Sequence, residues 1–211
     1  MVQIKFKIMI STLANVSPKA KIGKNVTIEA FATVYEDVEI GDNTHIHPNA
    51  LIYPDTIIGE NCQIFPGAII GIVSQDLKYK GERSTTVVGN NTIIREYVTI
   101  HKGTADRMTT KIGNNCLLMA YVHIAHDCII GNNVIIANYT GLAGHVTIED
   151  FVIIEGMGAV QQFVTIGAHS FLAGDSKVRK NVPPYIRVAR EPLQYIGVNT
   201  VGLTRRGFEK E

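Results

Sequence analysis

The sequence contains no tryptophan, only three cysteines and no large excess of charge of either sign. Its 20 Lys and Arg residues are balanced by 19 Asp and Glu residues, so composition indicates neither nucleic-acid binding nor an acidic tail. No apolar run approaches the roughly 18 residues that a membrane-spanning helix needs, so we expect no membrane insertion. Only 18% of the residues are charged and 45% are hydrophobic, which excludes disorder for most of the chain. The 211 residues fit one domain, or one domain with a short appendage.

The cysteines and the N-terminal residues indicate the cellular compartment. Cys62, Cys116 and Cys128 have neither the spacing of a metal site nor the even number of a disulfide framework. The first residues place Lys5 and Lys7 within a short apolar stretch, which is unlike the uncharged core of a secretory signal. We therefore expect reduced thiols and a cytoplasmic protein. Met9 is an alternative start, which would make residues 1–8 an extension.

A six-residue repeat runs through most of the chain, as in Lys-Ile-Gly-Lys-Asn-Val (21–26) and Ile-Ile-Gly-Asn-Asn-Val (129–134). Of the 28 positions spaced by six from Val16 to Val178, 25 hold Ile, Leu or Val. A second column, spaced by six from Ala20 to Val182, holds small or β-branched residues except at Lys80, and it contains all three cysteines. The cysteines are therefore predicted to be small interior residues.

This period predicts an all-β solenoid. Residues two apart share one face of a strand, so each small residue and the aliphatic residue after it point inward, and the rest of the hexad supplies a turn. Repetition of this unit coils the chain into a β-helix. The similarity to known hexapeptide-repeat proteins implies three hexads per coil, a triangular prism and a left-handed parallel β-helix. Residues 21–182 would then form nine coils.

Interruptions of the repeat predict the chain's organisation. We expect an N-terminal extension and cap at 1–20, the β-helix at 21–182 and a short non-repeat C-terminal extension at 183–211. Pro183 and Pro184 are predicted to end the ladder, because proline lacks the N–H that a further strand would donate. Loops are expected at 75–86 and 105–110, where inward aliphatic residues are missing, and such loops commonly carry binding residues.

One small patch of the surface is a candidate catalytic site. With three hexads per coil, His126 stacks on Gly144 and Gly144 on Gln162, while Asp127 stacks on His145. An imidazole beside a carboxylate is a typical general base near neutral pH, and a glycine N–H can stabilise an oxyanion. Two alternatives remain open at this stage: exposed histidines without a role, and a metal site.

Longer motifs then carry a family resemblance that covers residues 10 to 208. The sequence resembles the bacterial acyl-[acyl-carrier-protein]–UDP-N-acetylglucosamine O-acyltransferases, which open lipid A synthesis. The motifs are Gln75-Asp-Leu-Lys-Tyr79, Ile94-Arg-Glu-Tyr-Val-Thr-Ile-His-Lys-Gly-Thr104, His123-Ile-Ala-His-Asp-Cys128, Leu142-Ala-Gly-His-Val146, Val182-Pro-Pro-Tyr185, Gly197-Val-Asn199 and Gly202-Leu-Thr-Arg-Arg-Gly-Phe208.

The resemblance implies a cytoplasmic homotrimer that transfers a 3-hydroxyacyl chain from acyl carrier protein to the 3-hydroxyl of UDP-N-acetylglucosamine, without metal or cofactor. By motif, His126 would be the general base, Asp127 its orienting carboxylate and Gly144 the oxyanion donor. Gly174 would leave room for a long acyl chain, and Arg205 would contact the phosphates. The remaining residues expected to bind substrate are Gln75, Asp76, Lys78, His123, His145, Gln162 and Asn199.

The chain also departs from the family pattern. Gln161 stands where relatives often have His, and Val201 stands where a Glu often contacts the nucleotide. The chain stops at Glu211, where relatives continue into a helical C-terminal domain, so we expect a truncated C-terminal extension. Two competing hypotheses are a trimeric scaffold or binding protein with weak catalysis, and another hexapeptide-repeat enzyme such as a zinc hydratase.

Overall fold

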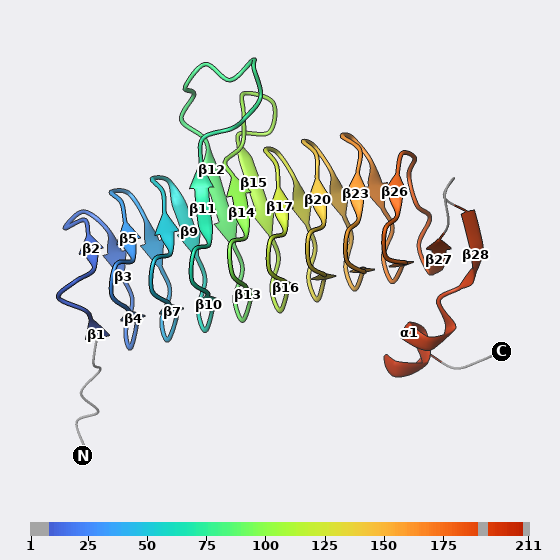
Figure 1. The fold of residues 1–211 in the computed structure, drawn as a ribbon, viewed down its shortest axis with the longest axis horizontal. Coiled ribbons are helices and arrows are strands. Elements are labelled where there is room, and N and C mark those ends of the chain that lie inside the picture. The colour runs from blue at the N-terminus through green and yellow to red at the C-terminus, as the bar shows by residue number, and fades with distance from the viewer. Residues whose placement is uncertain (1–8, 190–193, 209–211) are drawn as a thin grey trace.

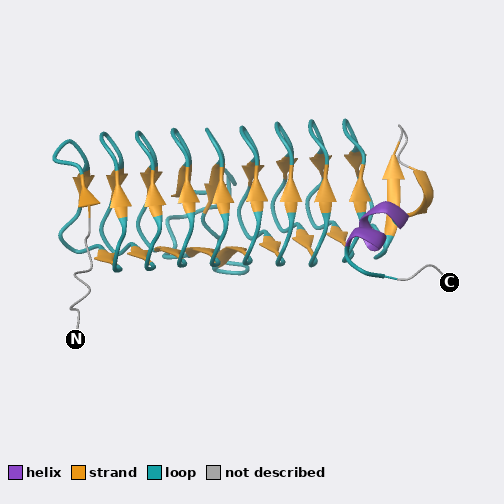
Figure 2. Ribbon diagram, turned by 90° about the horizontal axis from the view of Figure 1, so that it is seen from below, coloured by secondary structure: helices purple, strands orange, loops and turns teal. Residues whose placement is uncertain are grey.

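The structure, a computed structural model, describes residues 9–189 and 194–208. The chain winds as a parallel β-helix in which successive strands belong to three different sheets (Figures 1 and 2). Within each sheet, strands of successive coils pair in parallel, and the last described strand, Gln194–Val198, pairs antiparallel with its neighbour. We name the sheets A, B and C after the order in which the chain visits them.

The strands are two to five residues long. Sheet A comprises β1 (Met9–Ile10), β4 (Thr27–Ile28), β7 (His45–Ile46), β10 (Gln63–Ile64), β13 (Ile93–Ile94), β16 (Leu117–Leu118), β19 (Ile135–Ile136), β22 (Ile153–Ile154), β25 (Phe171–Leu172), β27 (Ile186–Ala189) and β28 (Gln194–Val198). Sheet B comprises β2 (Asn15–Val16), β5 (Thr33–Val34), β8 (Leu51–Ile52), β11 (Ile69–Ile72), β14 (Thr99–His101), β17 (His123–Ile124), β20 (Gly141–Leu142), β23 (Ala159–Val160) and β26 (Lys177–Val178). Sheet C comprises β3 (Lys21–Ile22), β6 (Glu39–Ile40), β9 (Thr56–Ile58), β12 (Thr85–Val88), β15 (Thr109–Ile112), β18 (Ile129–Ile130), β21 (Thr147–Ile148) and β24 (Thr165–Ile166).

The two inward columns of the repeat form the core. Aliphatic residues such as Ile124 and Leu142 are fully buried, and the small residues beside them fill the corners. Cys62, Cys116 and Cys128 are buried free thiols, which confirms that they are interior residues. Burial raises the pKa of Cys128 to about 12, so this thiol is not a nucleophile near neutral pH.

The turns between sheets share one backbone device. One residue of most turns takes a left-handed conformation, with φ between 54° and 67° at the non-glycine positions. Asn and Asp tolerate this region best, which explains the Gly-x-Asn turns of the repeat. Bulky residues also occupy it, and Tyr121 and Tyr139 stack with ring centroids 5.0 Å apart. Asp127 and His145 hold the same turn position, so their side chains project from one edge of the prism.

Paired residues on neighbouring strands are three hexads apart in sequence along most of the β-helix, as in the pairing of Lys21 with Glu39. We call this separation the strand offset. It lengthens by two hexads where β9 pairs with β12 and by one hexad where β12 pairs with β15, because two loops leave the prism. The prediction of nine coils for residues 21–182 was therefore wrong. Sheet C, which begins with β3, has eight strands. Together the two insertions add as many residues as one regular coil contains.

Both loops emerge from the row of turns that leads from sheet B to sheet C, which we call the B–C edge (Figure 1). The first connects β11 to β12 over residues 73–84, and the second connects β14 to β15 over residues 102–108. Both loops begin and end slightly earlier than the hexad pattern indicated. Arg83 anchors the first loop by donating to the Asp55 carboxylate at 2.8 Å.

The two ends of the ladder also differ from the expectation. β1 and β2 already pair with β4 and β5, so within the described residues the ladder extends back to Met9. After the two prolines, β27 pairs in parallel with β25, so the prediction that the prolines end the ladder was wrong. The prolines lie in the turn before β27, where their missing N–H is not needed. The expected extensions include residues 1–8 and 209–211, which lie outside the described residues.

The C-terminal segment closes this end of the prism. β28 pairs antiparallel with β27, and the helix α1 (Thr200–Arg205) follows it (Figure 2). The described part of the chain contains no helix with the length and apolar character that a bilayer crossing needs.

Candidate active site

The predicted patch lies on consecutive turns of the B–C edge. His126 and Asp127 occupy the turn between β17 and β18, and Gly144 and His145 occupy the next one. The His145 N–H donates to the His126 carbonyl at 3.0 Å, and the Phe163 N–H donates to the Gly144 carbonyl at 3.2 Å. The predicted stacking is therefore present. The exposed Gln162 stands on the third turn.

His126 and Asp127 form a hydrogen-bonded dyad. Nδ1 of His126 lies 2.9 Å from Oδ2 of Asp127, and the His126 side chain is 12% exposed. A carboxylate at this distance stabilises the proton on Nδ1, which leaves the lone pair of a neutral imidazole on Nε2. Nε2 lies 3.8 Å from a carboxylate oxygen of Asp76 in the first loop. The free nitrogen of the dyad therefore faces the space beneath that loop.

Gly144 lies directly against the His126 ring. A Cβ built on Gly144 would lie 2.5 Å from both Cε1 and Nε2 of the imidazole, so any other residue would displace the ring. Among the described residues, the Gly144 N–H has no hydrogen-bond partner. An N–H without a partner beside a basic nitrogen can stabilise a developing oxyanion.

The Asp127 carboxylate is fully buried and is held by the second loop. It accepts hydrogen bonds from the Thr104 N–H at 2.9 Å, the Thr104 hydroxyl at 2.5 Å and the Arg107 N–H at 3.3 Å. Burial raises the pKa of Asp127, but the hydrogen bonds from Thr104 and His126 outweigh burial and hold the pKa below its ordinary value. Asp127 is therefore ionised at neutral pH.

Sequence reasoning missed this support. Thr104 and Arg107 both precede Asp127 by more than one regular coil, so a period of three hexads does not bring them together. The available signal was the interruption at 105–110, which lengthens the local strand offset by one hexad. Thr110 also contributes, since its hydroxyl accepts from the Asp127 N–H at 2.8 Å.

Three further histidines line the patch or lie beside it. The His145 ring stacks on Phe163 with centroids 4.5 Å apart and meets the His126 ring edge-on at 5.0 Å. Nδ1 of His123 lies 2.8 Å from the Thr99 hydroxyl, and the His123 ring packs against His101 at 5.1 Å. Burial lowers the pKa of both His101 and His123, which favours neutral rings. Sequence reasoning did not assign His101 to the patch.

A metal ion is the alternative use of this cluster. His126, Asp127 and His145 offer ligand atoms within 4.8 Å of one another. However, Oδ2 of Asp127 already accepts from the Thr104 hydroxyl and from His126 Nδ1. A bound ion would replace at least one of these hydrogen bonds, so the geometry fits a general base better than a metal ligand set.

The other predicted residues fall into separate regions of the chain. Gln75 and Lys78 are exposed in the first loop, where the Asp76 carboxylate accepts from the Lys78 N–H at 2.9 Å. Gly174 is exposed on a turn from sheet A to sheet B. Asn199 and Arg205 line a pocket of about 250 Å³ beside the outer face of sheet A.

Asn199 has a structural role in this pocket. It is buried, its side-chain oxygen accepts from the Gly202 N–H at 3.2 Å, and its side-chain N–H donates to the His169 carbonyl at 2.8 Å. These bonds start α1 and hold it against the prism. Phe171 and Arg187 complete the wall of the pocket, which lies away from the B–C edge on a single chain.

Comparison with known proteins first gives the class. The family described as bacterial transferase hexapeptide (six repeats) matches residues 19–54, 37–71 and 109–144. The domain described as UDP N-acetylglucosamine O-acyltransferase, domain 2, matches residues 181–211. The repeats and the solved structures reported below confirm the predicted left-handed parallel β-helix.

Individual relatives then give the family. The UDP-N-acetylglucosamine acyltransferase structure from Bacteroides fragilis is 48% identical, with a TM-score of 0.95, covering 96% of this chain and 79% of that one. The Acinetobacter baumannii structure is 41% identical, with a TM-score of 0.94 and the same coverage. The curated acyl-[acyl-carrier-protein]–UDP-N-acetylglucosamine O-acyltransferase of Aliivibrio fischeri is 47% identical over 143 residues, which is 67% of this chain and 55% of the relative. This chain belongs to the UDP-N-acetylglucosamine acyltransferase family, and it matches about half the length of its curated relatives.

Proposed function

We propose that this protein transfers a 3-hydroxyacyl chain from acyl carrier protein to the 3-hydroxyl of UDP-N-acetylglucosamine, the first step of lipid A synthesis. The observation that carries the proposal is the His126–Asp127 dyad, whose free nitrogen lies against the backbone of Gly144. Two of the relatives reported above, at 47% and 48% identity, are named as acyltransferases of UDP-N-acetylglucosamine, and the curated one also names the acyl carrier protein. The geometry provides the two elements that attack of a hydroxyl on a thioester needs.

The first element is a base. His126 Nε2 takes the proton of the sugar 3-hydroxyl as the oxygen attacks the thioester carbonyl carbon. The proton on Nδ1 stays on the ring, and ionised Asp127 stabilises the resulting imidazolium. Because Thr104 and Arg107 hold the carboxylate, the ring keeps one orientation during the proton transfer.

The second element is an oxyanion donor. The attack forms a tetrahedral intermediate whose oxyanion is placed to accept from the Gly144 N–H. Collapse of the intermediate breaks the carbon–sulfur bond. The imidazolium of His126 then returns its proton to the leaving thiolate of the carrier. The balance is one ester formed, one thioester cleaved and one thiol released, with no oxidant, metal or cofactor consumed.

The remaining residues are proposed to bind the substrates. Gln75, Asp76 and Lys78 come from the first loop, and the patch itself supplies the sugar-facing side chains His123, His145 and Gln162. Arg205 and Asn199 are proposed to bind the uridine diphosphate in the C-terminal pocket, with Arg205 facing the phosphates. Since Asn199 also starts α1, its contribution includes holding the helix that carries Arg205.

The outer face of sheet B offers a track for the acyl chain. His123 pairs in register with Gly141, and Gly141 pairs with Ala159, so small residues follow the histidine along this face. A Cβ on Gly141 would meet no atom within 4 Å. The track leads toward the edge that carries Gly174, where a small residue leaves room for a long chain.

Distribution of the sites supports a homotrimer. His126 stands on the B–C edge and Arg205 stands beside sheet A of a single prism, so one molecule of UDP-N-acetylglucosamine reaches both residues only where neighbouring chains meet. We therefore propose active sites between subunits of a closed trimer. A cytoplasmic location is part of the proposal, and three buried free thiols support it.

The test is acyl transfer from 3-hydroxyacyl carrier protein to UDP-N-acetylglucosamine by wild type and His126→Ala. We expect His126→Ala to lose orders of magnitude in kcat while its thermal melting and its assembly in native mass spectrometry stay unchanged. Lys21→Ala, which breaks an exposed ion pair on sheet C, is the matched surface control and should stay fully active. Equal activity in wild type and His126→Ala would remove His126 from its role, and no activity in either would favour a scaffold. Dialysis against a chelator should leave transfer unchanged. A metal ion bound at the patch of a wild type that transfers no acyl chain would favour the zinc hydratase class.

A further inference from the structure

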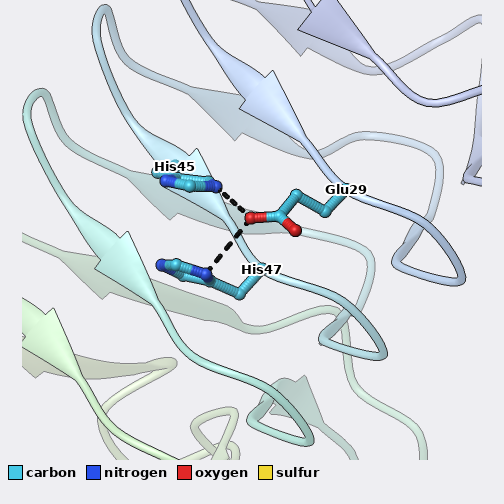
Figure 3. Close-up of side chains that lie close together, drawn as sticks. All are labelled: Glu29, His45 and His47. Carbon is cyan, nitrogen blue, oxygen red and sulfur yellow. Dashed lines mark hydrogen bonds and ion pairs between the residues drawn. The ribbon is translucent and has the colours of Figure 1, made fainter.

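A second cluster of ligand-type side chains lies outside the proposed active site, on the outer face of sheet A (Figure 3). His45 and His47 are two residues apart on and just after β7, so both point outward on the same side. The neighbouring strand β4 pairs with β7 through Thr27 and His45, which places Glu29 beside His47. Two adjacent coils thus bring two imidazoles and one carboxylate together.

The three side chains converge on one point. Oε1 of Glu29 lies 2.5 Å from Nε2 of His45 and 3.3 Å from Nδ1 of His47, and Figure 3 shows both rings turning a nitrogen toward this oxygen. Ligand atoms around one ion stand about 3 to 3.4 Å apart when the metal–ligand bonds are about 2.0–2.1 Å long. The 3.3 Å spacing lies in this range and the 2.5 Å spacing lies below it, so an ion can enter only when the His45 ring moves away and a metal bond replaces its hydrogen bond to Glu29.

One nitrogen of the cluster has no hydrogen-bond partner. Nε2 of His47 is buried and has no hydrogen-bond partner. If His47 carries its proton on Nε2, then the lone pair of Nδ1 faces the carboxylate oxygen of Glu29, and two electron-rich atoms repel each other. A cation between Nδ1 and Oε1 removes this repulsion, because both atoms then act as ligands.

The surroundings hold His47 and leave the cluster open. The His47 ring is stacked between His45, at 3.9 Å, and Phe65, at 4.5 Å, and the Arg95 guanidinium packs on the Phe65 ring. On a single chain, the side chains of Glu29, His45 and His47 are 37%, 35% and 20% exposed, so each of the three can be reached from outside the prism. The His45 and His47 planes differ by only 20°, so binding to both rings requires the partly exposed His45 ring to tilt away.

We infer that Glu29, His45 and His47 form a surface site for a divalent transition metal ion of the Zn²⁺ type. Two imidazoles and one carboxylate suit Zn²⁺, Co²⁺ or Ni²⁺, whereas Mg²⁺ and Ca²⁺ prefer all-oxygen sites. An ion here would join two successive coils in the N-terminal half of the prism, several coils from His126. The inference is independent of the proposed acyl transfer.

The test uses untagged protein freed of metal and titrated with Zn²⁺ by isothermal titration calorimetry at pH above 7. We expect one ion per chain in the wild type. His47→Gln and Glu29→Gln should each weaken binding by more than about 100-fold, since even outer-shell changes cost about 10–100-fold. Both variants should melt like the metal-free wild type, because the side chains are partly exposed. Absence of binding in the wild type, or unchanged affinity in both variants, would overturn the inference.

Two further variants separate this site from the patch on the B–C edge, whose His126, Asp127 and His145 also offer nearby ligand atoms. His126→Ala should keep the full stoichiometry and affinity, as should His169→Gln, an imidazole outside both clusters. Zn²⁺ should raise the melting temperature of His126→Ala and leave that of His47→Gln unchanged. Loss of the ion in His126→Ala with retention in His47→Gln would assign the ion to the patch and reject the surface site.

Discussion

At the scale of single residues, Asp127 is the most constrained member of the patch. Its backbone holds a left-handed conformation with φ of 58°, its carboxylate is fully buried, and the second loop supplies three of its hydrogen bonds. A buried carboxylate with this many donors stays ionised and fixed. The orientation of the proposed base therefore depends on Thr104, a residue that need not touch the substrate.

Thr104→Val tests this positioning role. The substitution keeps the shape and the backbone N–H but removes the hydroxyl that donates to Oδ2 of Asp127. We expect kcat to fall about tenfold, because a hydrogen bond to a charged group contributes roughly 1.5–3 kcal/mol, part of which orients the dyad. KM for UDP-N-acetylglucosamine should stay unchanged, and Thr104→Ser should restore kcat. A rise in KM with unchanged kcat would contradict the role.

The lowered pKa of Asp127 predicts how stability depends on pH. An aspartate in the unfolded chain has a pKa of about 3.9, and hydrogen bonds hold the folded value lower. The ionised carboxylate therefore stabilises the fold above about pH 3.9, and this stabilisation is lost as pH falls through the folded pKa. Asp127→Asn lacks the titrating group.

Urea unfolding measures this difference. The gap in free energy of unfolding between wild type and Asp127→Asn should stay constant near pH 5 and shrink as pH falls toward 3. If the difference in free energy of unfolding is the same at pH 5 and at pH 3, then the pKa of the Asp127 carboxyl does not change on folding.

At the scale of elements, the six-residue repeat correctly predicted which residues point inward and which residues lie on consecutive turns. The column from Val16 to Val178 marks inward positions. Together with the three hexads per coil that the resemblance to hexapeptide-repeat proteins implied, it predicted that His126, Gly144 and Gln162 lie on consecutive turns. The same period failed at Thr104 and Arg107, because a loop changes the strand offset and the pattern does not say how the loop folds back. It also failed after Pro184, where tertiary pairing with β25 extends the ladder.

Substitution of Gly174 tests whether the turn between β25 and β26 limits the length of the acyl chain. A Cβ on Gly174 would meet the Gly156 carbonyl at 3.3 Å and no closer atom, so Gly174→Met should fold. The longer side chain would project from the turn into the path proposed for the acyl chain. We expect kcat/KM to fall at least tenfold for long 3-hydroxyacyl donors and to be kept or raised for short ones. An equal loss with every donor length would argue against a length-determining position.

At the scale of the whole molecule, the residues proposed to form one active site lie on different parts of a single chain, and this separation requires a particular assembly. His126 lies on the B–C edge, whereas Arg205 lines the pocket beside sheet A. In a closed trimer, the B–C edge of one chain can face sheet A of the next, so each site would combine His126 from one chain with Arg205 from its neighbour. Strand pairing is continuous along the prism, so the two residues stay on separate parts of a single chain.

Mixed trimers test this arrangement. His126→Ala and Arg205→Ala should each be nearly inactive when assayed below KM for UDP-N-acetylglucosamine. Co-expression of the two variants with different purification tags should restore activity, because about one site in four then has His126 and Arg205 both intact by random association. A chain that carries both substitutions, co-expressed with His126→Ala, is the matched control and should stay inactive, since no chain then supplies His126. If both residues serve a site from the same chain, then every site in the mixed trimers lacks one of them and activity should not return.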